Sequence, residues 1–193
     1  MKSTTSGRAC SRLWRQVLAA GLLACAGVLW GSETKAVSEY QVKAVFLFRF
    51  TQFVEWPTEA GAAGDRPFVI GIVGEDPFGS VLDDTVRKEL VQEHRPIVVQ
   101  RFQDSETLPK CDILFIAPSE KDRLKDVLGR VRGQAVLTVA DTAGAAEQGA
   151  MINLLVVQGS VKIEINQDAM TAAGLKVSAK LLSLAKIVKG KAP

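Results

Sequence analysis

Four short apolar runs alternate with amphipathic segments through the middle of the chain. The runs are typical of buried strands and cover residues 68–73, 97–102, 111–116 and 135–139. Helices are predicted between them at residues 80–90 and 119–131, the second starting at Ser119. Continuous apolar strands that alternate with helices indicate a largely parallel sheet covered on both faces.

The pattern changes toward the end of the chain. Residues 151–165 predict a β-hairpin with a two-residue turn at Gly159-Ser160. Asn166 is placed to cap a short helix that Gly174 ends, and a last amphipathic helix is predicted over residues 178–189. The apolar side of that last helix consists of Leu181, Leu184, Ala185 and Val188. The predicted fold class is a single α/β domain: a mixed, mostly parallel sheet flanked by helices on both faces, with a C-terminal hairpin and helix.

The first helix of the domain is predicted over residues 39–55, with Ser38 as its N-cap and Pro57 beyond its end. It has two apolar stripes. One consists of Val42, Phe46, Phe50 and Phe53, and the other of Tyr40, Ala44, Leu47, Phe48 and Val54. A helix with one side in water would carry fewer apolar residues, so the second stripe should contact another element or another chain. The candidates for a dimer or partner surface are Phe46, Phe48, Phe50 and Phe53.

The N-terminus is typical of a secretory signal. A basic stretch without acidic residues precedes an uncharged apolar run at residues 17–30, and small residues follow near Ala36. The run is short of the roughly 20 apolar residues that span a bilayer. We therefore expect a cleaved signal peptide at residues 1–36 and a periplasmic mature domain at residues 37–193.

Two alternatives for the N-terminus stay open. The segment could remain as an uncleaved anchor. Leu22-Leu23-Ala24-Cys25 also resembles a lipobox, which would make Cys25 the lipidated first residue of an anchored protein.

Removing the leader changes the charge and the cysteine content. The whole chain has 24 basic and 21 acidic side chains, of which the leader holds five and one, so the mature part has 19 and 20. A net charge of −1 gives no reason to expect a nucleic-acid partner. Cys111 is the one cysteine outside the leader, so no internal disulfide can form, and its place in an apolar run predicts burial.

The mature sequence lacks the residue patterns of common active sites. His94 is its single histidine, so neither an ordinary zinc site nor a Ser-His-Asp triad is expected, and there is no Walker loop and no GxGxxG. We expect no cofactor, no metal and no enzyme activity. Acid–base catalysis by carboxylates such as Glu75, Asp76 or Glu164 is the weaker alternative, because it needs a separation that sequence does not give.

The loop of residues 74–79, from Gly74 to Gly79, follows the first buried strand. Ligands of open α/β sheets bind beyond the carboxyl ends of strands, so this loop is where a small ligand would bind. The candidate ligand residues are Glu75, Asp76 and Phe78. The loop brings two acids and no basic residue, which suits phosphate poorly. A purely structural turn is the competing interpretation.

Ordered segments of the chain resemble the YfiR family. The family's opening helix signature is matched by residues 43–57, KAVFLFRFTQFVEWP. Further matches follow in the family's order at residues 74–79, 111–120, 136–141, 149–152, 162–166 and 173–182. Each piece alone is weak, but the ordered set is specific and covers nearly all of residues 39–188.

The resemblance implies a periplasmic repressor, often dimeric, that contacts the periplasmic domain of an inner-membrane diguanylate cyclase. It would lower cyclic-di-GMP signalling and biofilm formation, and an OmpA-like outer-membrane lipoprotein could sequester it. Family members often carry several cysteines with redox-sensitive disulfides, whereas here Cys111 stands alone. The alternative from another class is a periplasmic small-ligand-binding module that uses the loop of residues 74–79.

The resemblance also implies where the cyclase would bind. The matching partner-binding residues are Met151, Ile152, Glu164, Ile165, Met170 and Leu175. Ile152, Ile165 and Leu175 could equally be ordinary core residues. Glu164 alternates with apolar neighbours along a strand, so we expect it to face solvent or a partner.

The leader generates a first prediction: the chain is exported and shortened. Mass spectrometry of the protein purified from cells should find a periplasmic species that begins near Val37. Intact Met1 in the cytoplasmic fraction would contradict export. A diacylglycerol on Cys25 would replace release into the periplasm by anchoring to a membrane.

Overall fold

The computed structural model describes residues 34–57, 66–87, 90–91, 95–103 and 110–190. The chain divides into two units, Met1–Val37 and Ser38–Pro193. Of the first unit only residues 34–37 are described, and they are helical. The predicted signal peptide lies almost wholly outside the described residues and stays a prediction.

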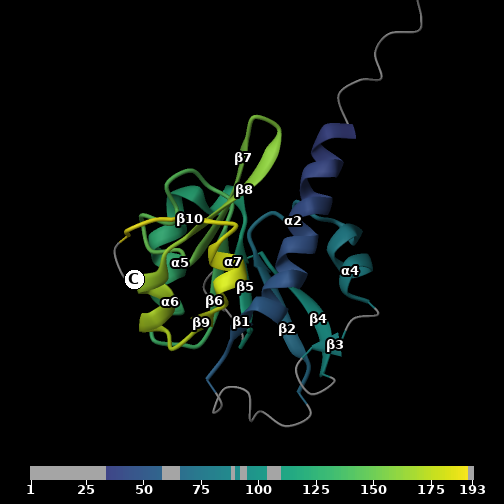
Figure 1. Cartoon of the computed structure of the whole chain (residues 1–193). Coiled ribbons are helices and arrows are strands. Elements are labelled where there is room, and N and C mark those ends of the chain that lie inside the picture. The colour runs from purple at the N-terminus through teal and green to yellow at the C-terminus, as the bar shows by residue number, and fades with distance from the viewer. Residues whose placement is uncertain (1–33, 58–65, 88–89, 92–94, 104–109, 191–193) are drawn as a thin grey trace, which may run out of the picture. The chain divides into compact units, whose positions relative to one another are not determined.

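An eight-stranded sheet forms the centre of the second unit, in the order β10-β8-β7-β6-β5-β2-β4-β3 (Figure 1). Five strands run parallel: β2 (Phe68–Val73), β4 (Arg95–Phe102), β5 (Ile113–Ile116), β6 (Leu137–Ala140) and β7 (Ile152–Val157). The antiparallel neighbours are β3 (Leu90–Val91) and β8 (Ser160–Ile165), and β10 (Lys186–Ile187) runs parallel to β8. The predicted mixed, mostly parallel sheet is confirmed.

The strand order reverses once. The chain passes from β2 outward to β4, returns to the other side of β2 as β5, and continues through β6 to β7. The reversal point therefore lies between β2 and β5. In open α/β sheets the loops at the carboxyl ends of the two strands beside such a point leave a crevice for a ligand.

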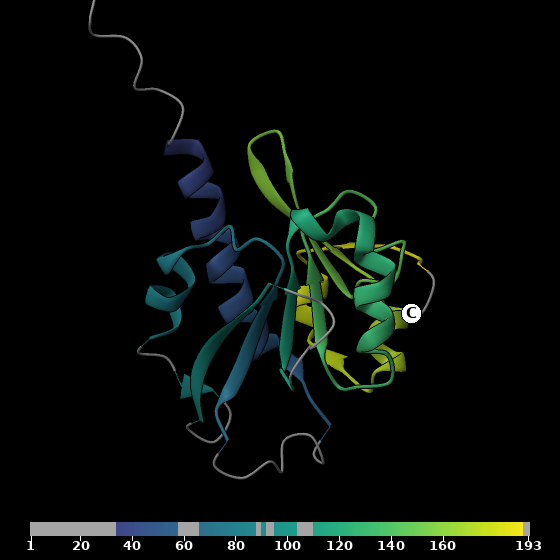
Figure 2. The same ribbon diagram turned by 180° about the vertical axis from the view of Figure 1, so that it is seen from behind.

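Helices cover both faces of the sheet. One core contains residues from α2 (Thr34–Phe53), α4 (Ser80–Val86), α6 (Gln167–Ala172) and α7 (Ala179–Leu182). The other contains residues from α5 (Leu124–Arg130), which follows the 3₁₀ helix η1 (Pro118–Arg123), and Figure 2 shows α5 on the side away from α2. Because side chains alternate along a strand, β2 sends Ile70 and Ile72 into the first core and Val69 and Val73 into the second.

Helix α2 differs from its prediction at both ends. It begins at Thr34, so Ser38 lies inside it and is not its cap. It ends at Phe53 because the next residues, β1 (Val54–Glu55), pair antiparallel with β9 (Lys176–Val177). Among the other helices, α4 stops at Val86, earlier than expected.

The apolar stripes of α2 are only partly covered. Phe48 and Phe50 are buried in the sheet-facing core, and Phe46 and Phe53 are half-buried. Val42 and Val45 are 41% and 46% exposed. The four phenylalanines therefore do not form one exposed surface, although an apolar strip remains on the outer side of the helix.

The C-terminal hairpin forms as predicted, with its turn one residue earlier. Val157 pairs with Ser160, so the turn residues are Gln158 and Gly159. Their φ angles of 52° and 75° are both positive, as a type I′ turn requires. The β7–β8 ribbon extends beyond the rest of the sheet in both views (Figures 1 and 2).

The predicted last helix is wrong beyond its first turn. Ser178 does cap a helix, but α7 covers only Ala179–Leu182. The chain then adds β10 to the sheet, where the Val188 N–H donates to the Ile165 carbonyl at 2.8 Å. Leu184, expected on the apolar side, is 65% exposed. Pairing with the free edge of β8 outweighed the helical periodicity of this segment.

A second prediction concerns Asn166, whose fully buried side chain makes two structural hydrogen bonds. Its Oδ1 accepts from the Ala169 N–H at 3.0 Å, capping α6, and its Nδ2 donates to the Ala146 carbonyl at 2.9 Å. Asn166→Ala should cost about 2–4 kcal/mol of unfolding free energy, because a cap and a buried carbonyl both lose their partner. Urea denaturation measures the loss. Ser178→Ala, which removes only a cap, is the control and should cost about 1 kcal/mol.

Candidate functional site

The loop after β2 lies in close contact with the loop after β5, at the point where the strand order reverses. Gly74 has a φ of 90°, and a Cβ there would lie 2.5 Å from Ser119 Oγ and 2.7 Å from Glu120 Cγ. Only glycine allows this approach. The Glu75 N–H then donates to Ser119 Oγ at 2.9 Å, which ties the two loops together.

A crevice of about 220 Å³ opens beside these loops. It is lined by Tyr40, Glu75, Asp76, Pro77, Pro118 and Ser119. Glu75 is exposed and Asp76 is half-buried, so two of the three predicted ligand residues do line a hollow. The third, Phe78, is buried and makes edge-to-face contacts with Tyr40 and Phe115 at centroid distances of 5.3 and 4.8 Å. Phe78 therefore anchors the loop in the core.

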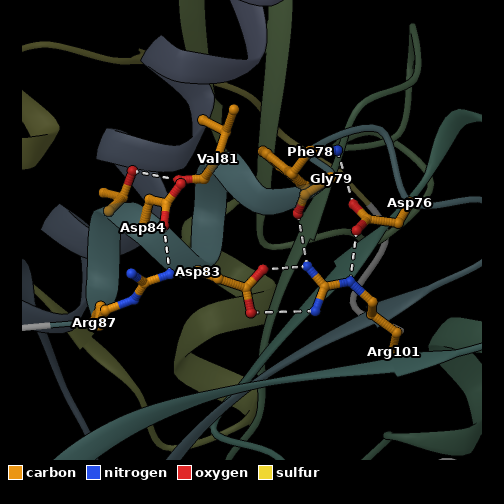
Figure 3. Close-up of polar contacts among 9 residues, drawn as sticks. Asp76, Phe78, Gly79, Val81, Asp83, Asp84, Arg87 and Arg101 are labelled. Atoms are coloured by element: carbon orange, nitrogen blue, oxygen red, sulfur yellow. Dashed lines mark hydrogen bonds and ion pairs between the residues drawn. The ribbon is translucent and has the colours of Figure 1, made fainter.

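Arg101 supplies the basic residue that the loop itself lacks (Figure 3). Its Nε donates to Asp76 Oδ2 at 2.6 Å and its Nη2 to the Gly79 carbonyl at 2.8 Å, and it also forms an ion pair with Asp83 of α4. The hydrogen bonds that Arg101 donates to Asp83 and then to Asp76 raise the pKa of its guanidinium. Arg101 stands on β4 opposite Ile72, so strand pairing brings it to the loop although it is 25 residues from Asp76.

A buried ion cluster joins α2 to the same edge of the sheet. Lys43 is fully buried, and its Nζ donates to Asp141 Oδ2 at 2.7 Å and forms an ion pair with Glu39. The Tyr40 hydroxyl donates to the same Asp141 oxygen at 3.0 Å. Burial, and then the Asp141 charge, raise the pKa of Tyr40. Asp141 directly follows β6, so this cluster lies at the carboxyl ends of the parallel strands.

All six residues predicted to bind a partner are buried in this structure. Their exposed fractions are 3% for Met151, 0% for Ile152, 7% for Glu164, 0% for Ile165, 1% for Met170 and 3% for Leu175. The expectation that Glu164 faces outward is wrong. It lies opposite Ile163 and Ile165 as expected, but its Oε1 accepts from Lys186 Nζ at 2.9 Å and its Oε2 from Asn153 Nδ2 at 3.3 Å. The added strand β10 places Lys186 beside it on the neighbouring strand.

Two hollows flank helix α6 and reach part of this buried block. One, of about 330 Å³, is lined by Gln167, Met170, Thr171, Gly174, Leu175, Lys176 and Val177. The other, of about 140 Å³, includes Met151 among its lining residues. Met151, Met170 and Leu175 are therefore approachable from the surface, whereas Ile152 and Ile165 belong to the core beneath the sheet.

The remaining candidates are possible metal ligands, Cys111 and His94. Among the described residues, no three His, Cys, Asp or Glu side chains are grouped to hold a metal ion. Cys111 is buried as expected, and burial raises the pKa of its thiol to about 12. His94 lies outside the described residues. No helix in the described ranges is long and apolar enough to cross a membrane.

A family model described as YfiR/HmsC-like matches residues 40–186. Among solved structures, an ABC domain from Streptococcus pneumonia in complex with L-Trp is similar, with a TM-score of 0.52, 8% identity, and coverage of 80% of this chain and 60% of that one. The ligand-free substrate-binding protein CD0873 from Clostridium difficile matches with a TM-score of 0.45, 14% identity, and coverage of 64% and 55%. The chain thus spans less than two thirds of either protein, and at these identities the first likeness indicates a shared α/β fold alone.

The Lys43 cluster generates a third prediction. Lys43→Met should cost about 3–5 kcal/mol of unfolding free energy, because it leaves the largely buried carboxylate of Asp141 without its cation. The double variant with Asp141→Asn should lose about 1–3 kcal/mol less than the sum of the single variants. Urea denaturation of the two single variants and the double variant measures these losses. If the loss in the double variant equals the sum of the single losses, the two residues are not coupled. Arg87→Met, which breaks an exposed pair with Asp84, is the control and should cost no more than about 1 kcal/mol.

Proposed function

This chain belongs to the YfiR/HmsC-like family, and from that membership we propose that it is a periplasmic regulator of diguanylate cyclase signalling. In its finer form, the proposal is that the mature protein binds the periplasmic domain of an inner-membrane diguanylate cyclase and represses it. An OmpA-like lipoprotein that sequesters the repressor, and a homodimer, are parts of the same proposal. The observation that carries it is the family match over residues 40–186.

The described site supports a binding role over a catalytic one. Three of the acids at the carboxyl edge of the sheet are engaged in structural pairs: Asp76 with Arg101, Asp141 with Lys43, and Glu164 with Lys186, whereas Glu75 is exposed in the crevice. A general acid or base must reach a substrate proton, and these carboxylates are committed to cations that hold loops and strands in place.

We place the partner surface around α6. The larger hollow gives access to Met170 and Leu175, and its rim carries the exposed Thr171 and Gln167. An apolar side chain of a partner inserted there would contact the two buried residues, as interface anchors commonly do in pockets. This keeps the partner-binding role of Met170 and Leu175 without requiring Glu164 to face outward.

A second candidate function is the binding of a small ligand. It is favoured by the crevice at the strand-order reversal, where Glu75 and Asp76 line a hollow beside Tyr40. Under this alternative the protein would sense or carry a ligand and would not act on a cyclase.

A fourth prediction tests the proposed function in cells. Deleting the gene should raise cyclic-di-GMP and promote surface attachment. Thr171→Arg should reproduce this rise, because a long charged side chain would occupy the hollow beside α6. Its unfolding free energy should change by no more than about 0.5 kcal/mol, because Thr171 is exposed. The measurements are cyclic-di-GMP in cells and urea denaturation of the purified variant.

Ser80→Arg is the matched control, since Ser80 is also exposed but lies on α4. It should leave cyclic-di-GMP unchanged. A rise in the deletion strain with normal signalling by Thr171→Arg would remove the partner from this hollow. Unchanged cyclic-di-GMP in the deletion strain would favour the small-ligand alternative.

A further inference from the structure

The crevice beside the loop of residues 74–79 is lined mainly by hydrogen-bond acceptors. Glu75 and Asp76 contribute carboxylate groups, which only accept hydrogen bonds when they are ionised. Pro77 and Pro118 line the same space and have no backbone N–H. Pro118 is also the first residue of η1, so the start of that helix offers no N–H from its first position to an anion.

The two remaining lining residues have little donor capacity left. The Tyr40 hydroxyl already donates to Asp141 Oδ2 at 3.0 Å, and Ser119 Oγ accepts from the Glu75 N–H at 2.9 Å. Of the six lining side chains, only that of Ser119 keeps a hydrogen to donate. Such a space suits an ammonium group, which has three N–H donors and no acceptor.

Arg101 does not neutralise the acids on its side of the crevice. It forms ion pairs with both Asp76 and Asp83, so one negative charge of that group is left over (Figure 3). Glu75 adds a second negative charge, because it is exposed and its side chain has no ion pair within the described ranges. An excess of one sign of charge around a hollow attracts ligands of the other sign.

The ion cluster on α2 adds to this excess. Lys43 pairs with both Glu39 and Asp141, and again one negative charge is left over. Tyr40 lines the crevice and donates to Asp141, so it connects the cluster to the crevice wall. No basic side chain is among the residues that line the crevice, so a cation from solution can meet these charges.

A buried carboxylate lies directly behind the same loop. Glu120 is 3% exposed, and a Cβ on Gly74 would lie 3.0 Å from its Oε1, which pairs with Arg123. Its Oε2 has no hydrogen-bond partner in the described part of the chain. A buried carboxylate oxygen without a donor costs free energy, and a cation nearby lowers that cost.

From these features we propose that the ligand of this crevice is a small organic ammonium ion. Its charged end lies between Glu75 and Asp76, and its apolar body lies against the two prolines. The volume of about 220 Å³ is below the roughly 300–1,000 Å³ of pockets for drug-sized ligands, so the ligand is small. A metal ion fits less well, because among the described residues no three His, Cys, Asp or Glu side chains are grouped to hold one. This ligand class presupposes the small-ligand function given above as the second candidate.

The fifth prediction compares three probes that share one apolar body: isobutylamine, the neutral isobutanol, and valine, which adds a carboxylate to the amine. Nuclear magnetic resonance of the isotopically labelled chain, purified from the periplasm, follows the amides of Tyr40, Glu75, Asp76 and Ser119. Near neutral pH isobutylamine is protonated, as the amine of lysine is, and it should shift these amides saturably at millimolar concentrations. Isobutanol lacks the charge, and the carboxylate of valine would meet the acids of the crevice, so neither should do so.

Glu75→Gln should weaken isobutylamine binding about tenfold, because it removes a charged acceptor and keeps the size of the side chain. Asp168→Asn is the matched control. It removes an exposed carboxylate at the start of α6, which follows the antiparallel strand β8 and so begins at the opposite edge of the sheet. It should bind like the parent chain, and both variants should keep the parent's melting temperature because both positions are exposed. Added salt should weaken the binding of the amine, since it screens the attraction between exposed charges.

The outcomes separate the ligand class from the small-ligand function itself. Unchanged isobutylamine binding by Glu75→Gln, or an equal loss in Asp168→Asn, would overturn the ammonium site. Isobutanol or valine shifting the four amides as strongly as isobutylamine would overturn the ammonium class and keep the crevice as a site for a small ligand. No saturable shift with any of the three probes would overturn both the ammonium class and the small-ligand alternative.

Discussion

The buried ion pair between Lys43 and Asp141 is the constraint on which the rest of this edge of the molecule depends. A fully buried ammonium is stable only with its counter-charge and hydrogen bonds in place, so α2 can pack on the sheet only in the register that brings Lys43 to the end of β6. That register also brings Tyr40 against Phe78 and the loop after β2. The crevice beside the loop is therefore positioned by an interaction outside it.

The elements with a strong local pattern could be predicted from sequence. The prediction for β2 has the observed bounds, and the hairpin and the Asn166 cap were found because turn and cap residues act on their immediate neighbours. The last helix could not be predicted. Its segment has helical periodicity, but after α7 the chain gains more by pairing with β8, and the availability of that edge is a property of the whole sheet.

The site residues divide in the same way, into those with a local sequence signal and those positioned by residues distant in the sequence. Glu75 and Asp76 were found because a glycine-rich turn after a buried strand is a local signal. Arg101 and Lys43 were not, because their partners lie 25 and 98 residues away in sequence. Alternation correctly placed Glu164 opposite its apolar neighbours. It could not reveal that Glu164 is buried and paired, since one of its partners is Lys186, on a strand that no pattern indicated.

The hairpin and helix α6 are directly connected through Asn166. This connection bears on how a regulator of this kind could respond to its partners. Strand β8 leads directly into Asn166, which caps α6, and the Asn166 N–H bonds to Met151 at the start of β7. The projecting ribbon and the hollow beside α6 are thus two ends of one continuous pair of strands. A contact that displaces the ribbon and also changes the α6 cap would be coupled to a contact at α6, and by linkage each would change the affinity of the other by the same factor.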